Sequence, residues 1–308
     1  MKPIRQLDFL GKRKLAFAFS GLLLLISVVS FFVNGLSLGI DFTGGSVYEM
    51  HFNQSVDLNK MRTSMADHGF ADANVQHFGS SEEVLLRLKP VADVKQEDLS
   101  QQVLEAANAS QPQPGEMRRV EFVGPQVGDE LLDDGGLALL FAFIGVLIYV
   151  SIRFEWKFSV GAVLSLVHDS VITLGFFSVF GWEFDMTVLS AILAIIGYSI
   201  NDTIVVYDRI RETTRSSRNI SVDEITNAAL NETLGRTILT SLTVFLTVLA
   251  LVFLGGKTIH GFAIAMLIGV VIGTYSSIYV ASAIALALGL NKDDLLVTQK
   301  ESVLDELP

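Results

Sequence analysis

The chain has 308 residues, of which half are hydrophobic and 18% are charged, fewer than the roughly 25% of a soluble domain. Because the hydrophobic residues form long runs, the sequence describes an integral membrane protein. The 33 acidic and 22 basic residues give a net charge of −11, which argues against a nucleic-acid partner, and the lack of cysteine excludes disulfides and thiol chemistry.

Six hydrophobic runs are long enough to cross a bilayer, whose core takes about 20 residues of helix. Six spans put both chain ends on one side of the membrane. The expected segments are an N-terminal stretch 1–14, a first span 15–33, an exterior domain 34–135, spans 136–152, 158–180 and 186–206, an amphipathic segment 207–236, spans 237–254 and 261–288, and an acidic tail 289–308.

Lys and Arg in the short connections indicate the orientation of the spans. They gather in the N-terminal stretch and after the second and fourth spans, whereas the connections after the third and fifth spans hold only Lys257. Both chain ends are therefore predicted to be cytoplasmic. The first run could also be a cleaved signal peptide, but its 19 residues are long for one and no Ala-x-Ala site follows, so we expect a retained anchor.

The exterior segment is expected to form a small domain, with 17 acidic and 7 basic residues between positions 34 and 134. Its hydrophobic patterns predict the order βαββαβ, a ferredoxin-like arrangement. The expected strands are 46–52, 72–78, 83–89 and 118–123, and the expected helices are 57–69 and 96–110. The predicted fold is thus an α-helical membrane bundle of six transmembrane helices with a small α+β domain.

Three local patterns describe the last two spans. Ser221 and Glu224 have the spacing of a capping box, which predicts the start of a helix that continues into the fifth span. Arg236 and Thr240 share one face of that span. In the sixth span, small residues recur at every fourth position over 261–289, a pattern that indicates close helix packing.

Ionisable residues at membrane depth cost about 2.5–3.5 kcal/mol each on insertion scales, so each is a candidate for function. Asp169 lies near the middle of the third span with His168 beside it. Asp202 follows Asn201 in the fourth span, and Arg236 lies at the mouth of the fifth. For Asp169 and His168 we expect a hydrogen bond between helices.

Asp202 and Arg236 fall at comparable depth, because the fourth span runs inward and the fifth runs outward. Opposite charges close together would keep Asp202 ionised, and separating them would let a proton bind. The residues alone leave two interpretations open, a proton relay and a static buried pair that fixes the register of the helices.

Five motifs resemble those of one known family. Residues 197–212, which include Asp202, are similar to the fourth-span signature of the SecF family, the smaller subunits of bacterial SecD–SecF export complexes in the resistance–nodulation–division (RND) superfamily. The motifs at 40–45, 167–169, 233–237 and 266–270 also fit. The similarity covers most of the chain, and the acidic tail lies outside it.

The resemblance implies a role in late protein translocation across the bacterial inner membrane, driven by the proton gradient, with no cofactor, no metal and no enzymatic activity. It implies SecD, the SecYEG channel and YajC as partners, unfolded preprotein as substrate, and lipid around the spans. Six spans are half of a twelve-span RND transporter, so SecD would supply the other half. The exterior domain 34–135 would then be periplasmic.

The same resemblance implies roles for single residues. Asp202 matches the aspartate assigned to proton transfer and Arg236 matches its partner, which favours the relay. The supporting polar groups would be Asn201, Asp169, His168 and Thr240.

The residues that follow the first span match the family's motif at the junction of membrane and domain. Glycines there suit a hinge or a tight turn, and the alternative is an ordinary linker. The motif residues are Asp41, Phe42, Thr43, Gly44 and Gly45.

Two further functions stay open. The chain could be half of a small-molecule RND pump, although an outer domain of about 100 residues is short for that. An intramembrane aspartyl protease needs two carboxylates that share a proton, but Asp169 and Asp202 differ in depth and no Gly-x-Gly-Asp motif is present. Whether protons or sodium ions would drive a transporter is also open.

Overall fold

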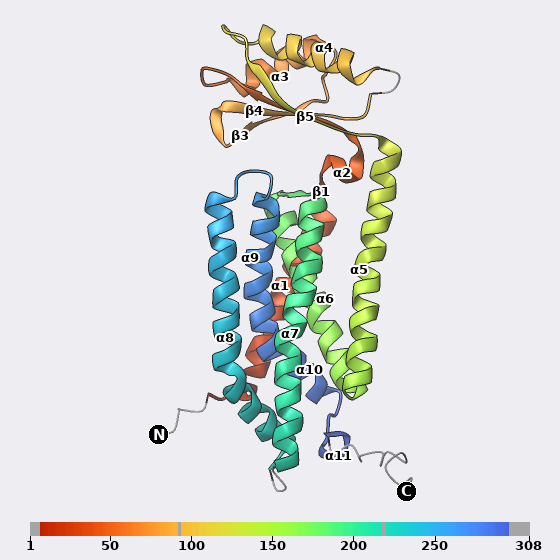
Figure 1. Cartoon of the computed structure of the whole chain (residues 1–308), viewed down its shortest axis with the longest axis vertical. Helices are drawn as coiled ribbons and strands as arrows, with labels where there is room; N and C mark the ends of the chain where they lie inside the picture. Colours follow the sequence, from red (N-terminus) through yellow and green to blue (C-terminus); the bar gives the residue numbers. More distant parts are fainter. Residues whose placement is uncertain (1–6, 92–93, 217–219, 296–308) are drawn as a thin grey trace, which may run out of the picture. The chain divides into compact units, whose positions relative to one another are not determined.

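The computed structural model describes residues 7–91, 94–216 and 220–295. They form two compact units, a helix bundle and a small α+β domain (Figure 1). The domain comprises Leu38–Leu137 together with Glu183–Met186, and the remaining residues belong to the bundle. The ends of the predicted N-terminal stretch and acidic tail, residues 1–6 and 296–308, lie outside the described residues.

Six helices in the described part of the chain are long and apolar enough to cross a membrane, which agrees with the predicted bundle. The sixth consists of three consecutive pieces. The helices are α1 (Arg13–Val33, after the short 3-10 turn Leu10–Lys12), α5 (Pro125–Arg153), α6 (Trp156–Phe180), α7 (Met186–Ser216), α8 (Val222–Leu254), and α9 (His260–Ser276) with the π-helical turn Ser277–Ala281 and α10 (Ser282–Ala287).

Several helices extend beyond the predicted spans, because polar turns at their ends are helical too. α5 begins at Pro125, a residue that suits the first position of a helix because it lacks the amide hydrogen. α8 begins at Val222, and Ser221 and Glu224 form the predicted capping box. A final short helix, α11 (Lys292–Leu295), follows the sixth span.

Three of the six helices form the inside of the bundle. Within the most apolar 18-residue stretch of each helix, between 50% and 61% is buried in α6, α7 and α9–α10. The buried share is only 11–22% in α1, α5 and α8. The inner helices approach their neighbours closely at glycines. A Cβ on Gly175 of α6 would meet Ser27 of the outer helix α1, and one on Gly269 of α9 would meet Ile195 of α7. The outer helices leave most of their apolar side chains for lipid or for another protein.

The π-helical turn interrupts the sixth span, where the sequence pattern predicts one continuous helix. Its bonds run from residue i to i+5, so the four-residue spacing of small side chains does not continue through it. α6 packs against this turn, and Gly161 provides the room, because a Cβ there would lie 2.7 Å from the carbonyl oxygen of Ala281.

The small domain has the predicted βαββαβ order. Its strands are all antiparallel, in the spatial order β3-β4-β2-β5. The two helices cover one face of the sheet (Figure 1) and enclose a core that includes Tyr48, Met50, Met61 and Val103. The elements are β2 (Gly45–His51), α3 (Leu58–Asp67), β3 (Asn74–Phe78), β4 (Ser80–Leu88), α4 (Gln96–Ala109) and β5 (Glu116–Val123).

Three short elements were not expected from the sequence. A helical turn, α2 (Ile40–Thr43), occupies the junction motif. Two two-residue strands, β1 (Ser37–Leu38) and β6 (Glu183–Phe184), pair with each other, although they are far apart in the chain. β6 lies in the connection between α6 and α7, for which only a turn was expected.

Candidate functional site

Asp169 of α6 is fully buried and accepts hydrogen bonds from three side chains. Ser199 of α7 and Ser276 of α9 each donate to Oδ2 over 2.7 Å, and His168 Nδ1 lies 2.9 Å from Oδ1. These four residues are the Asp169 cluster. The expected hydrogen bond between helices is therefore present, and it joins three helices rather than two. His168 Nε2 is buried without a partner among the described residues.

Asp202 of α7 is 2% exposed and much more sparsely bonded. Ser241 of α8 is its hydrogen-bond donor, over 3.5 Å to Oδ2, which is the outer limit for such a bond. Ser241 Oγ in turn accepts bonds from Tyr198 of α7 over 2.9 Å and from Thr274 of α9 over 2.7 Å. These four residues are the Asp202 cluster.

The two clusters share the same pair of helices. On α7 they use the adjacent residues Tyr198 and Ser199, and on α9 they use Thr274 and Ser276. A rotation of either helix would therefore alter the hydrogen bonds of both carboxylates. The hydroxyl partners were not identified from the sequence, although Ser199 lies one helical turn before Asp202, the spacing at which two side chains share a face.

Arg236 does not meet Asp202, contrary to the expectation from depth. Its side chain is exposed and forms no ion pair with Asp202 in the part of the chain that the structure describes, although its charge acts on that carboxylate. The reason is the direction in which each side chain points around the axis of α8. Arg236 and Ser241 are five positions apart on α8, so at 100° per residue they point about 140° apart, and Ser241 is the one that faces Asp202.

Arg236 instead lines a surface cavity of about 350 Å³ between α7 and α8. Arg209 in the same cavity pairs with Glu212 and with Glu232, so both helices contribute to a network of charges. Asp208, also in the lining, pairs with Arg153 over 2.9 Å. The cavity brings solvent to the outer side of Arg236.

The two other supporting residues lie at the edge of the Asp202 cluster. Asn201 is exposed on α7. Thr240 is half-buried, and its hydroxyl lies 3.0 Å from the carbonyl oxygens of Arg236 and of Thr237.

The junction motif is a closely packed turn in the small domain. Gly44 and Gly45 have φ angles of 66° and 120°, which side-chain-bearing residues rarely adopt. A Cβ on Gly45 would lie 2.3 Å from the carbonyl oxygen of Leu88, and one on Gly44 would lie 2.8 Å from Pro125 Cα. Of the predicted alternatives, this geometry agrees with the tight turn.

The other motif residues also have defined partners. Asp41 Oδ2 accepts a hydrogen bond of 2.9 Å from the amide of Met186, and Phe42 stacks on Phe184 with ring centroids 5.3 Å apart. Thr43 Oγ1 donates to the carbonyl oxygen of Gly39 over 3.1 Å.

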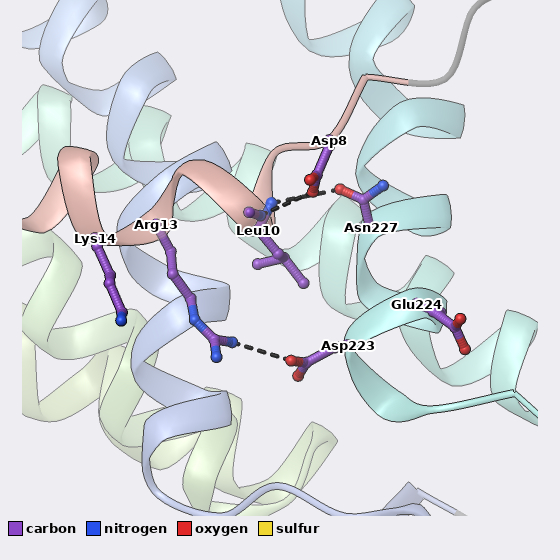
Figure 2. A pocket seen from close by; sticks show the side chains of 8 residues that line it. Asp8, Leu10, Arg13, Lys14, Asp223, Glu224 and Asn227 are labelled. Carbon is purple, nitrogen blue, oxygen red and sulfur yellow. Dashed lines mark hydrogen bonds and ion pairs between the residues drawn. The ribbon is translucent and has the colours of Figure 1, made fainter.

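A second surface cavity, of about 520 Å³, lies where the N-terminal segment meets the start of α8 (Figure 2). Figure 2 shows Arg13 pointing to Asp223, with which it pairs over 3.1 Å, and Asn227 beside the backbone of Leu10. None of the predicted site residues lines it. The contacts at this cavity join the N-terminal segment to the start of α8.

The groups that bond to Asp169 and Asp202 are hydroxyls and one imidazole. In the residues that the structure describes, no three His, Asp or Glu side chains are grouped to hold a metal ion. Asp169 and Asp202 have no hydrogen-bond partner in common, so they do not form the proton-sharing pair of an aspartyl protease.

The chain matches two family models. "Protein export membrane protein SecD/SecF, C-terminal" covers residues 103–291, and "SecD/SecF GG Motif" covers residues 29–56. Among curated proteins, it is 47% identical to the protein translocase subunit SecF of Vibrio alginolyticus, over 100% of this chain and 99% of that one. The SecF of Pseudomonas aeruginosa is 45% identical, over 99% of both chains.

Among solved structures, the chain is similar to SecDF from Thermus thermophilus, a translocon-associated membrane protein, with a TM-score of 0.83 and 37% identity. The match covers 92% of this chain and 39% of that one. The curated relatives are translocase subunits, not enzymes, so the aspartyl-protease hypothesis is wrong. Six apolar helices and these relatives make the chain a multi-pass membrane protein, and it belongs to the SecF family of protein translocase subunits.

Proposed function

We propose that this chain works with SecD to promote late preprotein translocation, driven by the proton-motive force. Family membership supports the translocase role, and the solved SecDF chain is longer, since this chain spans only 39% of it. That extra length leaves room for a partner half. The SecYEG channel, YajC and the unfolded preprotein complete the proposed assembly.

The proposed location is the bacterial inner membrane, with both chain ends in the cytoplasm. Lys12, Arg13 and Lys14 before the first span support it, as do the arginines after the fourth. The small domain is then periplasmic, where it meets the emerging preprotein.

The sparse bonding of Asp202 is the observation that carries the proton step. A buried carboxylate whose hydrogen bond from Ser241 is 3.5 Å long is held only weakly in the charged form, with Thr240 and the charge of Arg236 as the other favourable influences. When a proton binds, the carboxylate no longer attracts Arg236. Ser241 can then accept from the new O–H only if Tyr198 or Thr274 gives up its own bond to the Ser241 oxygen, which has two lone pairs. The contacts among α7, α8 and α9 change with it.

An export assay in inverted membrane vesicles tests this function. Asp202→Asn keeps the size of the side chain and removes the proton site, so we expect the gradient-dependent part of preprotein export to disappear while SecD still co-purifies. The matched control is Asp208→Asn, on the same helix but outside the Asp202 cluster. Undiminished export by Asp202→Asn, or a change in drug tolerance with export intact, would refute the proposal.

A further inference from the structure

The connection between α6 and α7 belongs to the small domain. Glu183–Met186 group with Leu38–Leu137 rather than with the helices on either side of them. Met186 is the first residue of α7, the helix that carries Asp202. The small domain therefore contains the first backbone amide of a transmembrane helix.

Asp41 binds that amide directly. Its Oδ2 accepts a hydrogen bond of 2.9 Å from Met186 N. The first amides of a helix have no partner within the helix, and a carboxylate there also interacts favourably with the helix dipole. Asp41 is thus a cap of α7 supplied from more than a hundred residues earlier in the chain.

Three further contacts hold the same connection to the small domain. Gly39 N donates to the carbonyl oxygen of Phe184 over 2.8 Å, and the ring of Phe184 stacks on Phe42. Arg87 on β4 forms an ion pair with Glu183. The approach at Gly39 is close, since a Cβ there would lie 2.9 Å from Glu183 Oε1.

These contacts differ in kind but act on three residues within a stretch of four. A backbone hydrogen bond, an aromatic stack, an ion pair and a helix cap all involve Glu183–Met186. From Met186, α7 continues without a break to Ser216, and Asp202 lies sixteen residues along it, about 24 Å at 1.5 Å per residue.

We propose that Asp41 is a positioning residue, which holds the first turn of α7 as a part of the small domain. A displacement of that domain then moves the start of the helix that carries Asp202. The inference rests on the proposed function, because it gives the domain and the proton site one helix in common. Gly44 and Gly45 of the same motif form the tight turn and do not cap α7.

Two substitutions separate the cap from the charge. Asp41→Ala removes the acceptor, whereas Asp41→Asn keeps a side-chain oxygen and caps helices equally well. A cap of this kind corresponds to roughly a 2- to 30-fold change in the equilibrium between a held and a released turn. Asp67→Asn, an exposed acid at the end of α3 in the same domain, is the charge-matched control.

Spin labels measure whether the turn is held. The chain has no cysteine, so Met186→Cys and Gln102→Cys give two unique sites within the small domain, and Met186→Cys keeps the backbone amide. With Asp41, with Asp41→Asn and with Asp67→Asn we expect one narrow distance distribution. With Asp41→Ala we expect a broad one, together with a several-fold slower export.

The outcomes separate this inference from the proposed function. A narrow distribution and normal export in Asp41→Ala would overturn the inference, and so would equal defects in Asp41→Ala and Asp41→Asn. Should Asp41→Ala fail to accumulate, Asp41→Leu also removes the acceptor with a side chain closer in size to aspartate, and a narrow distribution there would also overturn the inference. Normal export by Asp202→Asn would instead overturn the proton step and leave the distance result standing.

Discussion

The two buried aspartates of the bundle lie in opposite kinds of surroundings. Asp169 has two serine hydroxyls at 2.7 Å and an imidazole nitrogen at 2.9 Å, each from a different helix. Asp202 has the hydroxyl of Ser241 at 3.5 Å, with weaker influences from Thr240 and from the charge of Arg236. Both side chains are almost inaccessible to solvent, so burial alone does not distinguish the two aspartates.

The difference shows how one fold can use two acids in two ways. A buried carboxyl group with three short hydrogen bonds is expensive to disturb, because each partner left unsatisfied costs about 1–3 kcal/mol. Asp169 therefore fixes the positions of α6, α7 and α9 relative to one another. A carboxylate with one weak bond tolerates more than one state. Under the proposed function, a change in the protonation of Asp202 would shift the contacts among α7, α8 and α9 and leave the bundle intact.

Arg236→Met is expected to have the largest effect on this comparison. Methionine keeps an unbranched apolar side chain and removes the charge that acts on Asp202. We expect the gradient-driven export rate to fall at least about tenfold, equal to about 1.4 kcal/mol of activation free energy. The vesicle assay with and without a protonophore measures it. Export that stays within error of the wild type would show that Asp202 does not need this charge.

Asp169→Asn tests the other acid and should act on stability. Asparagine loses one of the two acceptor oxygens, so at least one of Ser199, Ser276 and His168 is left without its partner. We expect the free energy of unfolding to drop by about 1–3 kcal/mol, seen as a lower melting temperature in detergent. Export per assembled complex should stay near normal. A specific loss of gradient-driven export at normal stability would make Asp169 a proton site as well.

Asp208→Asn should have a smaller effect than either. Asp208 and Arg153 form an ion pair of 2.9 Å in which both side chains are about half exposed. Exposed pairs contribute about 0–1 kcal/mol, so export should stay within about twofold of the wild type. If this substitution matched Asp202→Asn in the vesicle assay, burial would not be what distinguishes the functional acid.

The smallest effect is expected at Asp294, a carboxylate outside the spans. A hydrogen bond from Lys157 at 2.5 Å lowers the pKa of Asp294 from its ordinary value of 3.8. A lowered pKa means that the pair stabilises the folded chain fully above pH 3.8 and loses that contribution as the pH falls further. The melting temperature of Asp294→Asn should lie slightly below the wild type at pH 7, and the gap should close in acid.

The sequence predicted most of the fold because hydrophobic length and helix caps are local signals. The six spans, the capping box at Ser221 and the βαββαβ order depend on residues that are neighbours in the chain. β6 could not be predicted in this way, because Glu183 and Phe184 become a strand only through pairing with a segment far away in the chain.

The site was predicted less completely than the fold. Intramembrane charge identified Asp169, Asp202 and Arg236, since each is costly wherever the helices lie. Depth along two helices does not show how each helix is rotated about its axis. The sequence therefore placed Arg236 against Asp202 and did not identify Ser241, which is the residue that faces it. The hydroxyls of Ser199 and Ser276 carry no such cost, so nothing in the sequence separated them from other small residues of the spans.

The π-helical turn at Ser277–Ala281 has a consequence for how the last span tolerates change. A π-helical turn takes up one extra residue within an otherwise regular helix. Deleting one residue there should leave a regular α-helix in which Ala283 and Ala285 keep their buried positions. Elsewhere in the span the same deletion would turn all later residues by about 100°, away from α6. A length change of one residue should therefore be tolerated better at this turn than at other places in the span.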